Sequence, residues 1–329
     1  MKSMRILAAG VLVLVLPAAV KAQSVDGRCS DPVFVGAGHE GGDACQKVVD
    51  IYRYLGDQLG TLIAGGSAVM GRGGTLGGFP HFNVELRANI MRASIPDVEA
   101  TGIRVGEPRR STYAINDKWV AIPQVDASLG IFRGIPVGVT YVGGVDAIAS
   151  AAYVADVTSG SVSITSSDGS LRLGYGARVG IMGETALTPG VSVTYLERRL
   201  PTIAIIAREG GNSLTIRDAD VKARSWRVVA SKSFVVFGVA AGIGQDHLRA
   251  SSVLDYDVEG FRPDRPFMLE TSPTRTNMFV DLSVTPFPLF RLVGELGRVS
   301  GGDVQTYNRF DPAAEDARVY GSVGVRVGY

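Results

Sequence analysis

The sequence predicts an all-β fold, a transmembrane antiparallel β-barrel of about 10–12 strands with a short N-terminal helical segment. Three observations predict this class. Hydrophobic residues recur with a period of two through most of the chain after residue 79. Long and short connectors alternate between these segments. The composition is 46% hydrophobic and 20% charged, with a mean hydropathy of +0.18, which lies between typical soluble and helical membrane proteins.

The first 22 residues have the layout of a secretory signal peptide. Lys2 and Arg5 precede an apolar run, Ile6–Leu16, and small residues lead up to Ala22. The run falls short of the roughly 18 apolar residues that a membrane-spanning helix requires, which disfavours the alternative of an uncleaved anchor. We therefore predict residues 1–22 as a signal peptide, cleaved after Ala22, and an exported mature chain.

Residues 23–78 are predicted to form a periplasmic or lumenal plug segment. Its strongest feature is a helical pattern over Asp43–Ile63, with apolar residues spaced by three and four and Asp43 at the N-cap position. A glycine-rich run, Gly65–Gly78, follows and ends the helix.

Cys29 and Cys45 are the two cysteines of the chain. In an exported protein they predict one disulfide, worth about 3 kcal/mol in the chain-entropy model. A redox pair or a metal site is the alternative, but no Cys-x-x-Cys and no neighbouring histidine pair supports it.

Residues 79–329 are predicted to form the barrel, because ten segments alternate apolar and polar residues. In the first, Phe82, Val84 and Leu86 alternate with Asn83, Glu85 and Arg87. The ten segments are Pro80–Met91, Gln124–Phe132, Val137–Val145, Leu171–Ile181, Val191–Leu196, Val221–Ala230, Phe234–Ile243, Thr276–Val284, Phe290–Leu296 and Val319–Tyr329.

The connectors sort into two lengths. Short ones are expected at Arg133–Ile135, Met182–Gly190, Ala230–Ser233 and Pro286–Leu289. Long ones are expected at Ala93–Trp119, Asp146–Ser170, Asp246–Arg275 and Arg298–Ala317, with Ala207–Ser213 a shorter member. This sorting is typical of an outer-membrane barrel, in which the short turns face the periplasm. Aromatic residues gather near predicted strand ends, as interfacial girdles require: Phe82, Trp119, Phe132, Tyr141, Tyr195, Trp226, Phe234, Phe287, Phe290 and Tyr329.

The last residues resemble the C-terminal insertion signal of bacterial outer-membrane β-barrel proteins. Tyr329 is the terminal aromatic residue, and Val323, Val325 and Val327 are the alternating apolar members. The resemblance implies a Gram-negative outer membrane as the location, lipid contact, and transient recognition by the barrel-assembly machinery. The helical segment before the barrel is also similar in placement to the plug of the long-chain fatty-acid transporter family. This chain is shorter than the members of that family, and its sequence predicts fewer strands than they have.

The polar faces of the strands predict a lumen. The residues expected to line it are Asn83, Glu85, Arg87, Asp126, Arg172, Arg178, Asp281, Arg291, Glu295 and Arg326. They permit two interpretations: a salt-bridge network that fills a narrow barrel, or a polar lining that selects solutes. The first is favoured, since about ten strands enclose little free space.

Three further motifs have a functional and a structural interpretation. Gly36–Gly41 matches G-x-G-x-x-G, but it lies between the two cysteines and lacks a following parallel strand, so a glycine-rich disulfide loop is preferred. Asp246 and His247 are the candidates for a barrel hydrolase, although a solvated pair is preferred. The acidic run Asp255, Asp257 and Glu259 has oxygen ligands but no EF-hand spacing, so no metal is predicted.

These observations predict a passive channel or uptake barrel for small or hydrophobic molecules, with the N-terminal helix as plug. The alternatives are a structural or adhesive barrel that binds partners through its long loops, and a barrel hydrolase. Basic and acidic residues nearly balance, 33 to 32, so a nucleic-acid partner is not expected. No cofactor is expected either.

Overall fold

The structure is a computed structural model that describes residues 24–97, 102, 104–154, 156–159, 162–209, 212–257, 262–263 and 265–328. The predicted signal peptide and Tyr329 lie outside the described residues.

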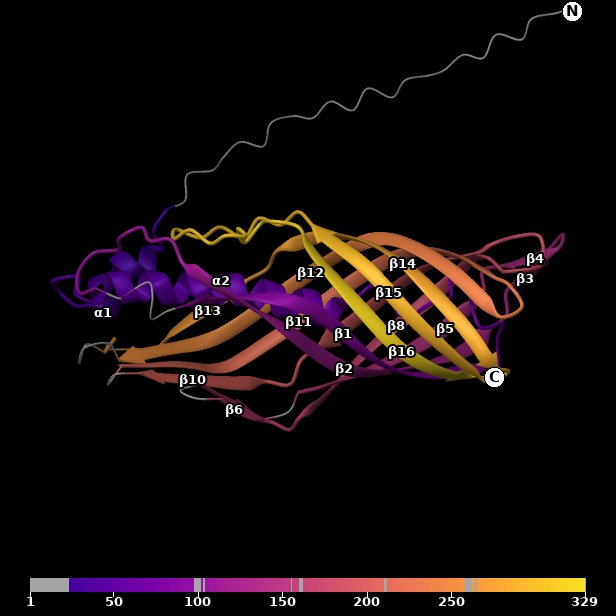
Figure 1. The fold of residues 1–329 in the computed structure, drawn as a ribbon, viewed down its shortest axis with the longest axis horizontal. Helices are drawn as coiled ribbons and strands as arrows, with labels where there is room; N and C mark the ends of the chain where they lie inside the picture. The colour runs from indigo at the N-terminus through magenta and orange to yellow at the C-terminus, as the bar shows by residue number, and fades with distance from the viewer. Residues whose placement is uncertain are drawn as a thin grey trace, which may run out of the picture.

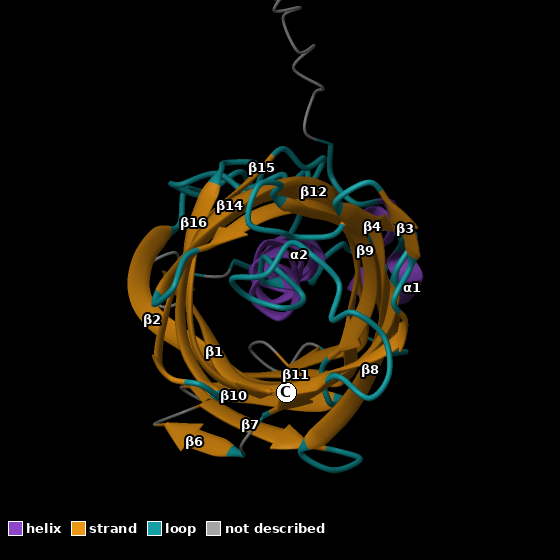
Figure 2. Ribbon diagram, turned by 90° about the vertical axis from the view of Figure 1, so that its right-hand side faces the viewer, coloured by secondary structure: helices purple, strands orange, loops and turns teal. Residues whose placement is uncertain are grey.

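Ten long strands form a closed antiparallel barrel (Figures 1 and 2), which confirms the predicted fold class. In order around the wall they are β1 (Phe82–Asp97), β2 (Ala114–Phe132), β5 (Val145–Tyr153), β8 (Leu171–Met182), β9 (Gly190–Arg199), β11 (Asn212–Ser233), β12 (Phe237–Asp257), β14 (Thr274–Phe287), β15 (Phe290–Ser300) and β16 (Arg318–Gly328). The first and last strands close the ring, with Asn83 opposite Gly328 and Ala88 opposite Val323.

Short strands extend this wall. At the far end of β11, the strands β10 (Ile203–Glu209), β7 (Val162–Ser166) and β6 (Val157–Ser159) continue the sheet, and β13 (Phe267–Thr271) pairs with β12. A separate hairpin, β3 (Ile135–Val137) with β4 (Thr140–Val142), links β2 to β5.

The two ends of the barrel differ. At the short-turn end, residues 183–189, 234–236 and 288–289 connect neighbouring strands, and β1 begins where β16 ends. At the long-loop end, the connectors include residues 98–113 and 301–317. The first described residues lie at the long-loop end, opposite the C-terminus (Figure 1).

Nine of the ten predicted segments fall on barrel strands, but Val137–Val145 was wrong. It covers the hairpin, and the strand β5 lies in the stretch expected as a loop, Asp146–Ser170. The expected turn Ala230–Ser233 is still part of β11. The expected long loops were also too long, since β1, β2 and β12 continue into them and β13 lies within one.

The helix α2 (Gly42–Ala64) enters the barrel from the long-loop end (Figure 2), after a 3-10 helix, η1 (Gly27–Ser30), and the short α1 (Pro32–Val35). Its N-cap is Gly41, so the prediction of Asp43 was wrong by two residues. None of the helices in the described part of the chain has the length and apolar character needed to cross a membrane.

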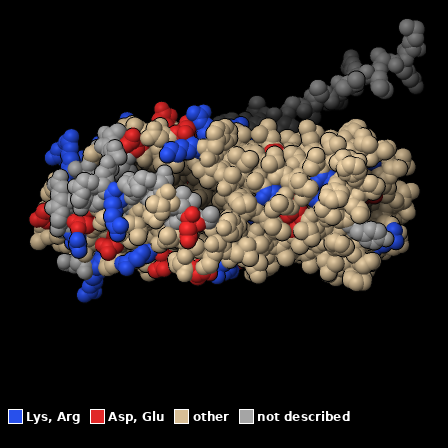
Figure 3. Space-filling view, turned by 60° about the horizontal axis from the view of Figure 1, so that its bottom comes forward, with Lys and Arg blue, Asp and Glu red and all other residues tan. Residues whose placement is uncertain are grey.

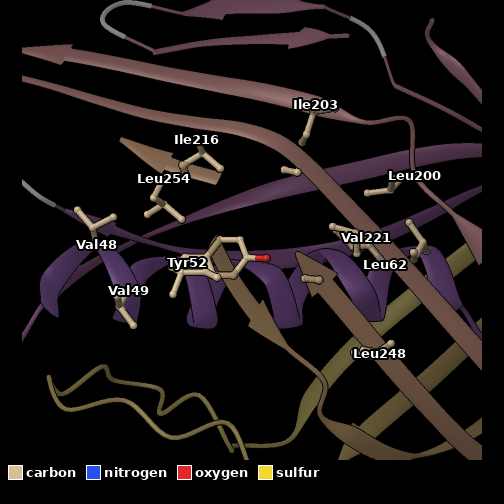
Figure 4. Packing of buried hydrophobic residues seen from close by; sticks show 14 of the residues in the cluster. Val48, Val49, Tyr52, Leu62, Leu200, Ile203, Ile216, Val221, Leu248 and Leu254 are labelled. Carbon is tan, nitrogen blue, oxygen red and sulfur yellow. The ribbon is translucent and has the colours of Figure 1, made fainter. Parts of the chain in front are cut away.

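The helix is held by an apolar cluster inside the wall. Figure 4 shows its side chains among those of β11 and β12, with Val48, Val49, Tyr52 and Leu62 on the helix and Val221, Leu248 and Leu254 on the strands. On another side of the helix, Tyr54 stacks on Phe310 of the 301–317 loop, with ring centroids 4.3 Å apart. Removing this apolar surface from water fixes α2 in place.

The outer surface of the wall has an apolar half and a charged half (Figure 3). On several strands the outward side chains change from apolar to charged: from Trp226 to Arg224 on β11, and from Ile90 to Arg92 on β1. The half next to the short turns is therefore an exposed apolar belt. β11 has 22 residues and β12 has 21, about twice the 9–11 that cross a bilayer, so both continue well beyond the belt.

Candidate functional site

The lumen of the barrel is occupied by the chain itself. Residues Gly65–Leu76, here called the lumen segment, run from the end of α2 toward the short-turn end, where β1 begins. Wall side chains bond to the main chain of this segment at successive levels. The bonds run from the Gly65 carbonyl, which accepts from Asn277 Nδ2 at 2.9 Å, to the Leu76 amide, which donates to Asp146 at 3.1 Å.

Carboxylates of the wall accept from amides of the segment. Glu295 accepts from Gly66 at 3.0 Å and from Ser67 at 2.7 Å, and Asp281 accepts from Gly71 at 2.6 Å. Each bond gives a buried main-chain amide a carboxyl oxygen as its acceptor, which a buried donor needs.

Guanidinium groups of the wall donate to carbonyls of the segment and of the end of α2. The pairs are Arg198 to Ala64 (2.6 Å), Arg227 to Gly65 (3.0 Å), Arg87 to Ser67 (2.7 Å), Arg326 to Met70 (2.6 Å) and Arg178 to Arg72 (3.3 Å). The segment has no regular secondary structure, so its buried main-chain groups need such partners.

Ion pairs hold several of these wall side chains. Arg178 pairs with Asp146 at 2.7 Å, and Arg227 pairs with Asp246 at 2.5 Å. Asp126 on β2 binds both Arg87 and Arg198. Because β5 and β8 lie between β2 and β9 in the wall, the Asp126–Arg198 pair passes over these two strands on the inner side of the barrel. The interior polar groups thus form one network around the segment.

Glycine is required where the segment touches the wall. A Cβ on Gly73 would lie 2.5 Å from the Ser231 amide nitrogen and 2.7 Å from the Gly190 carbonyl oxygen. A Cβ on Gly66 would lie 2.4 Å from the Glu295 carboxylate. The glycine-rich run therefore serves close packing inside the lumen.

Most of the residues expected to line the lumen lie in this interior. Asn83, Glu85, Arg87, Asp126, Arg178, Asp281, Glu295 and Arg326 are buried on the inward face. Arg291 is also on the inward side of its strand but is half-buried near the short turns. Arg172 lies at the opposite rim, where it pairs with Asp168 and donates to Thr202.

Sequence reasoning missed several contacts of the network. Asp146 lies on β5, which was expected to be a loop, and Arg198 lies beyond the expected end of its strand. Arg227 and Asn277 lie in segments that were predicted as strands, so their alternating position was the signal that could have found them.

Asp246 and His247 point to opposite sides of the wall. Asp246 is buried and accepts from Arg227 and Ser225, whereas His247 is exposed and its Nδ1 lies 3.0 Å from Thr274 Oγ1. The two side chains therefore do not form a dyad.

The acidic run is engaged in ion pairs where it is described. Asp255 pairs with Arg217 at 3.7 Å and Asp257 with Arg262 at 2.6 Å, while Glu259 lies outside the described residues. In the described part of the chain, no three His, Cys, Asp or Glu side chains gather as metal ligands would.

The C-terminal valines Val323, Val325 and Val327 face outward on β16 and are exposed. They belong to the apolar belt.

The N-terminal residues form a compact cap on α2. The predicted disulfide joins Cys29 to Cys45, and Gly36–Gly41 lies in the loop it closes. Asp26 accepts from Arg28 and pairs with Arg53 of α2 at 2.6 Å. Burial raises the pKa of Asp26, but the hydrogen bond and charge of Arg28 outweigh it and the net pKa is lowered.

Two acids on α2 fix its orientation at the long-loop end. Asp50 accepts from the amides of Tyr307 and Asn308, at 3.1 and 2.8 Å. Asp57 bonds to Arg275 Nε at 2.7 Å, and burial raises its pKa against the opposing charge of Arg275. The helix is thus tied to both a loop and the wall.

Solved structures give a likeness of fold at low identity. Neisserial surface protein A matches with a TM-score of 0.30 and 9% identity, over 75% of this chain and 97% of that one. The outer membrane protease OmpT of Escherichia coli matches with 0.40 and 9%, over 76% and 97%. The toluene transporter TodX of Pseudomonas putida matches with 0.32 and 11%, over 80% and 94%. No family model and no curated protein matches the chain.

The closed antiparallel barrel confirms the resemblance in fold to outer-membrane β-barrel proteins. The similarity in layout to the fatty-acid transporter family stays a prediction.

Proposed function

We propose that this chain is an outer-membrane barrel whose passage for small polar solutes is closed by its own N-terminal region, residues 24–78. The apolar belt fits the hydrocarbon core of a bilayer, and the charged half fits the space beyond it. In this proposal the barrel-assembly machinery recognises β16, and lipid covers the belt.

The contacts of the lumen segment are the main support for a solute passage. The lumen segment is held largely by charged side chains of the wall, and these belong to most of the barrel strands. If the segment withdraws, it leaves a passage lined by guanidinium and carboxylate groups. Such a lining favours small polar solutes over hydrophobic ones, because an apolar solute would have to displace bound water without replacing its hydrogen bonds.

Conductance in planar bilayers tests the proposal. The full mature chain should give a closed bilayer with rare openings, and deletion of residues 24–78 should give stable open channels. The matched control deletes residues 24–41 alone, which leaves α2 and the lumen segment in place and should stay closed. A barrel that stays closed without residues 24–78 would instead favour a structural or adhesive role for the long loops.

A further inference from the structure

A small cavity opens beside the lumen segment at the short-turn end of the barrel. Its volume is about 140 Å³. It lies between β1, β15, β16 and the turn after β14, and its polar lining includes the side chains of Arg72, Asn83, Arg291 and Arg326.

Three guanidinium groups line this cavity without a carboxylate partner among the described residues. Each has one hydrogen bond there, to a neutral oxygen. Arg72 donates to the Thr75 carbonyl at 3.1 Å, Arg291 to Thr285 Oγ1 at 3.1 Å, and Arg326 to the Met70 carbonyl at 2.6 Å. Since a guanidinium has five N–H donors, each group keeps donors for a ligand.

These positive charges also repel one another. Arg326 experiences the charges of Arg291, Arg72 and Arg178 together. Clustering like charges in a partly desolvated place costs free energy unless a counter-charge is present. The cluster therefore favours an anion.

Asn83 supplies a second and independent sign of a ligand. The residue is 4% exposed and lines the cavity, and its Nδ2 atom has no hydrogen-bond partner among the residues that the structure describes. A buried amide donor without an acceptor is costly, and an oxygen atom in the cavity would satisfy it.

The nearby acids offset only part of the positive charge of the cluster. Asp146 is bound to Arg178 at 2.7 Å, and Glu184 accepts from Ser231 Oγ at 2.9 Å and from the Ser233 amide. Glu85 is the one carboxylate near Arg326 whose two oxygens lack hydrogen-bond partners among the described residues. Glu184 and Glu85 thus supply two carboxylates against three lining guanidinium groups, which leaves one positive charge in excess.

We propose that this cavity binds a small oxyanion, with a phosphate group as the ligand. Phosphate matches the planar donor fork of arginine and can accept from Arg72, Arg291, Arg326 and Asn83 at once. The phosphate could belong to a soluble ion or to a lipid headgroup, since the short turns lie at a rim of the apolar belt. Binding does not depend on whether the barrel conducts.

Calorimetry on the full mature chain in a non-ionic detergent tests the site with inorganic phosphate, at an ionic strength held constant with chloride. We expect saturable binding to the parent protein. Arg291→Gln should weaken it about tenfold, the effect of losing one charge-assisted hydrogen bond. Arg291 is half-buried, so this variant should keep the fold, which heat-modifiable migration in a detergent gel checks.

Arg172→Gln is the matched control, because it removes the same charge from the opposite rim and should leave binding unchanged. Short-chain phosphatidic acid tests a lipid headgroup as the ligand. If it competes with phosphate for the parent protein, and if Arg291→Gln weakens this competition, the site is supported and a lipid headgroup is identified as an occupant. The proposal is overturned by phosphate heats no larger than those of chloride, or by equal binding to the parent and Arg291→Gln. Lipid binding that Arg291→Gln leaves intact, with no phosphate binding, would also count against it.

Discussion

Charged side chains in the lumen stabilise the closed barrel by hydrogen bonding to main-chain groups of the lumen segment. Arg227 illustrates this role: it donates to the carbonyls of Gly65 and Gly66 while Asp246 holds its guanidinium. Charged positions such as Arg87 and Glu295 could be predicted from the alternation in the sequence. Their partners could not, because the bonds join residues far apart in the chain, with Glu295 and Gly66 separated by 229 positions.

Arg227→Gln should destabilise the closed barrel by about 3–5 kcal/mol, because it leaves Asp246 as a buried charge without its guanidinium partner. We expect a lower midpoint of urea unfolding in detergent, followed by the loss of heat-modifiable migration. Arg172→Gln should stay within about 0.5 kcal/mol of the parent, since its ion pair is exposed. Equal midpoints for the two variants would contradict the structural role of Arg227.

Asp26→Asn should loosen the first described residues from α2, because it removes the carboxylate that binds Arg28 and Arg53. Trypsin cleavage after Arg28 should become several-fold faster at neutral pH, measured by mass spectrometry of the released peptide. Asp31→Asn, which alters only the cap of α1, is the control.

The pH dependence of the same contact follows from the lowered pKa of Asp26. Its stabilising contribution is present above the ordinary value of 3.8 and is lost as the pH falls through the lower folded pKa. A fluorophore attached at Ser24 should therefore become more mobile only in acid. Mobility that rises already near neutral pH would contradict this assignment.

At the scale of elements, alternation with a period of two predicts a strand correctly where its outward and inward faces differ strongly in polarity. On β1, exposed Val84 and Leu86 contrast with buried Glu85 and Arg87. The strand β5 was missed because its contrast is weak: alanines occupy its outward face, and Ile148 and Ala152 lie on its inward face. Alternation in Val137–Val145 instead came from a surface hairpin.

The lumen segment is an element without regular secondary structure, and close contact with the wall restricts it to small residues. Gly73→Ala should cost about 1–3 kcal/mol, because the added Cβ would meet main-chain atoms of β9 and β11 that cannot move independently. The unfolding midpoint should fall, and bilayers should show more frequent openings. Gly27→Ala meets no atom within 4 Å and should behave like the parent. A fully stable, closed Gly73→Ala barrel would show that the segment is not tightly enclosed.

For the whole molecule, the intermediate hydropathy follows from the division of the wall into three environments. Outward residues form the apolar belt in one half of the wall, outward residues in the other half include many charged ones, and inward residues are largely polar. The sequence could predict the barrel because outward apolar residues alternate with inward polar residues in most of the strands. It could not predict how far the strands continue beyond the belt, since the apolar alternation fades there while the pairing of β11 with β12 persists to Ser213 and Asp257.

The path of the chain predicts on which side of the membrane the amino terminus and the short turns of the mature protein lie. The lumen segment joins α2 at the long-loop end to the start of β1 at the short-turn end, so Ser24 and Gly328 lie at opposite ends of the barrel. If the short turns face the periplasm, as the sequence predicts, the mature amino terminus and its disulfide lie outside the cell. An epitope placed before Ser24 should therefore bind antibody on intact cells. The same epitope inserted between residues 186 and 187, in the short turn after β8, should bind only after the outer membrane is permeabilised. Labelling of the short turn on intact cells, with a protected amino terminus, would reverse the orientation, and the anion cavity would then open to the exterior.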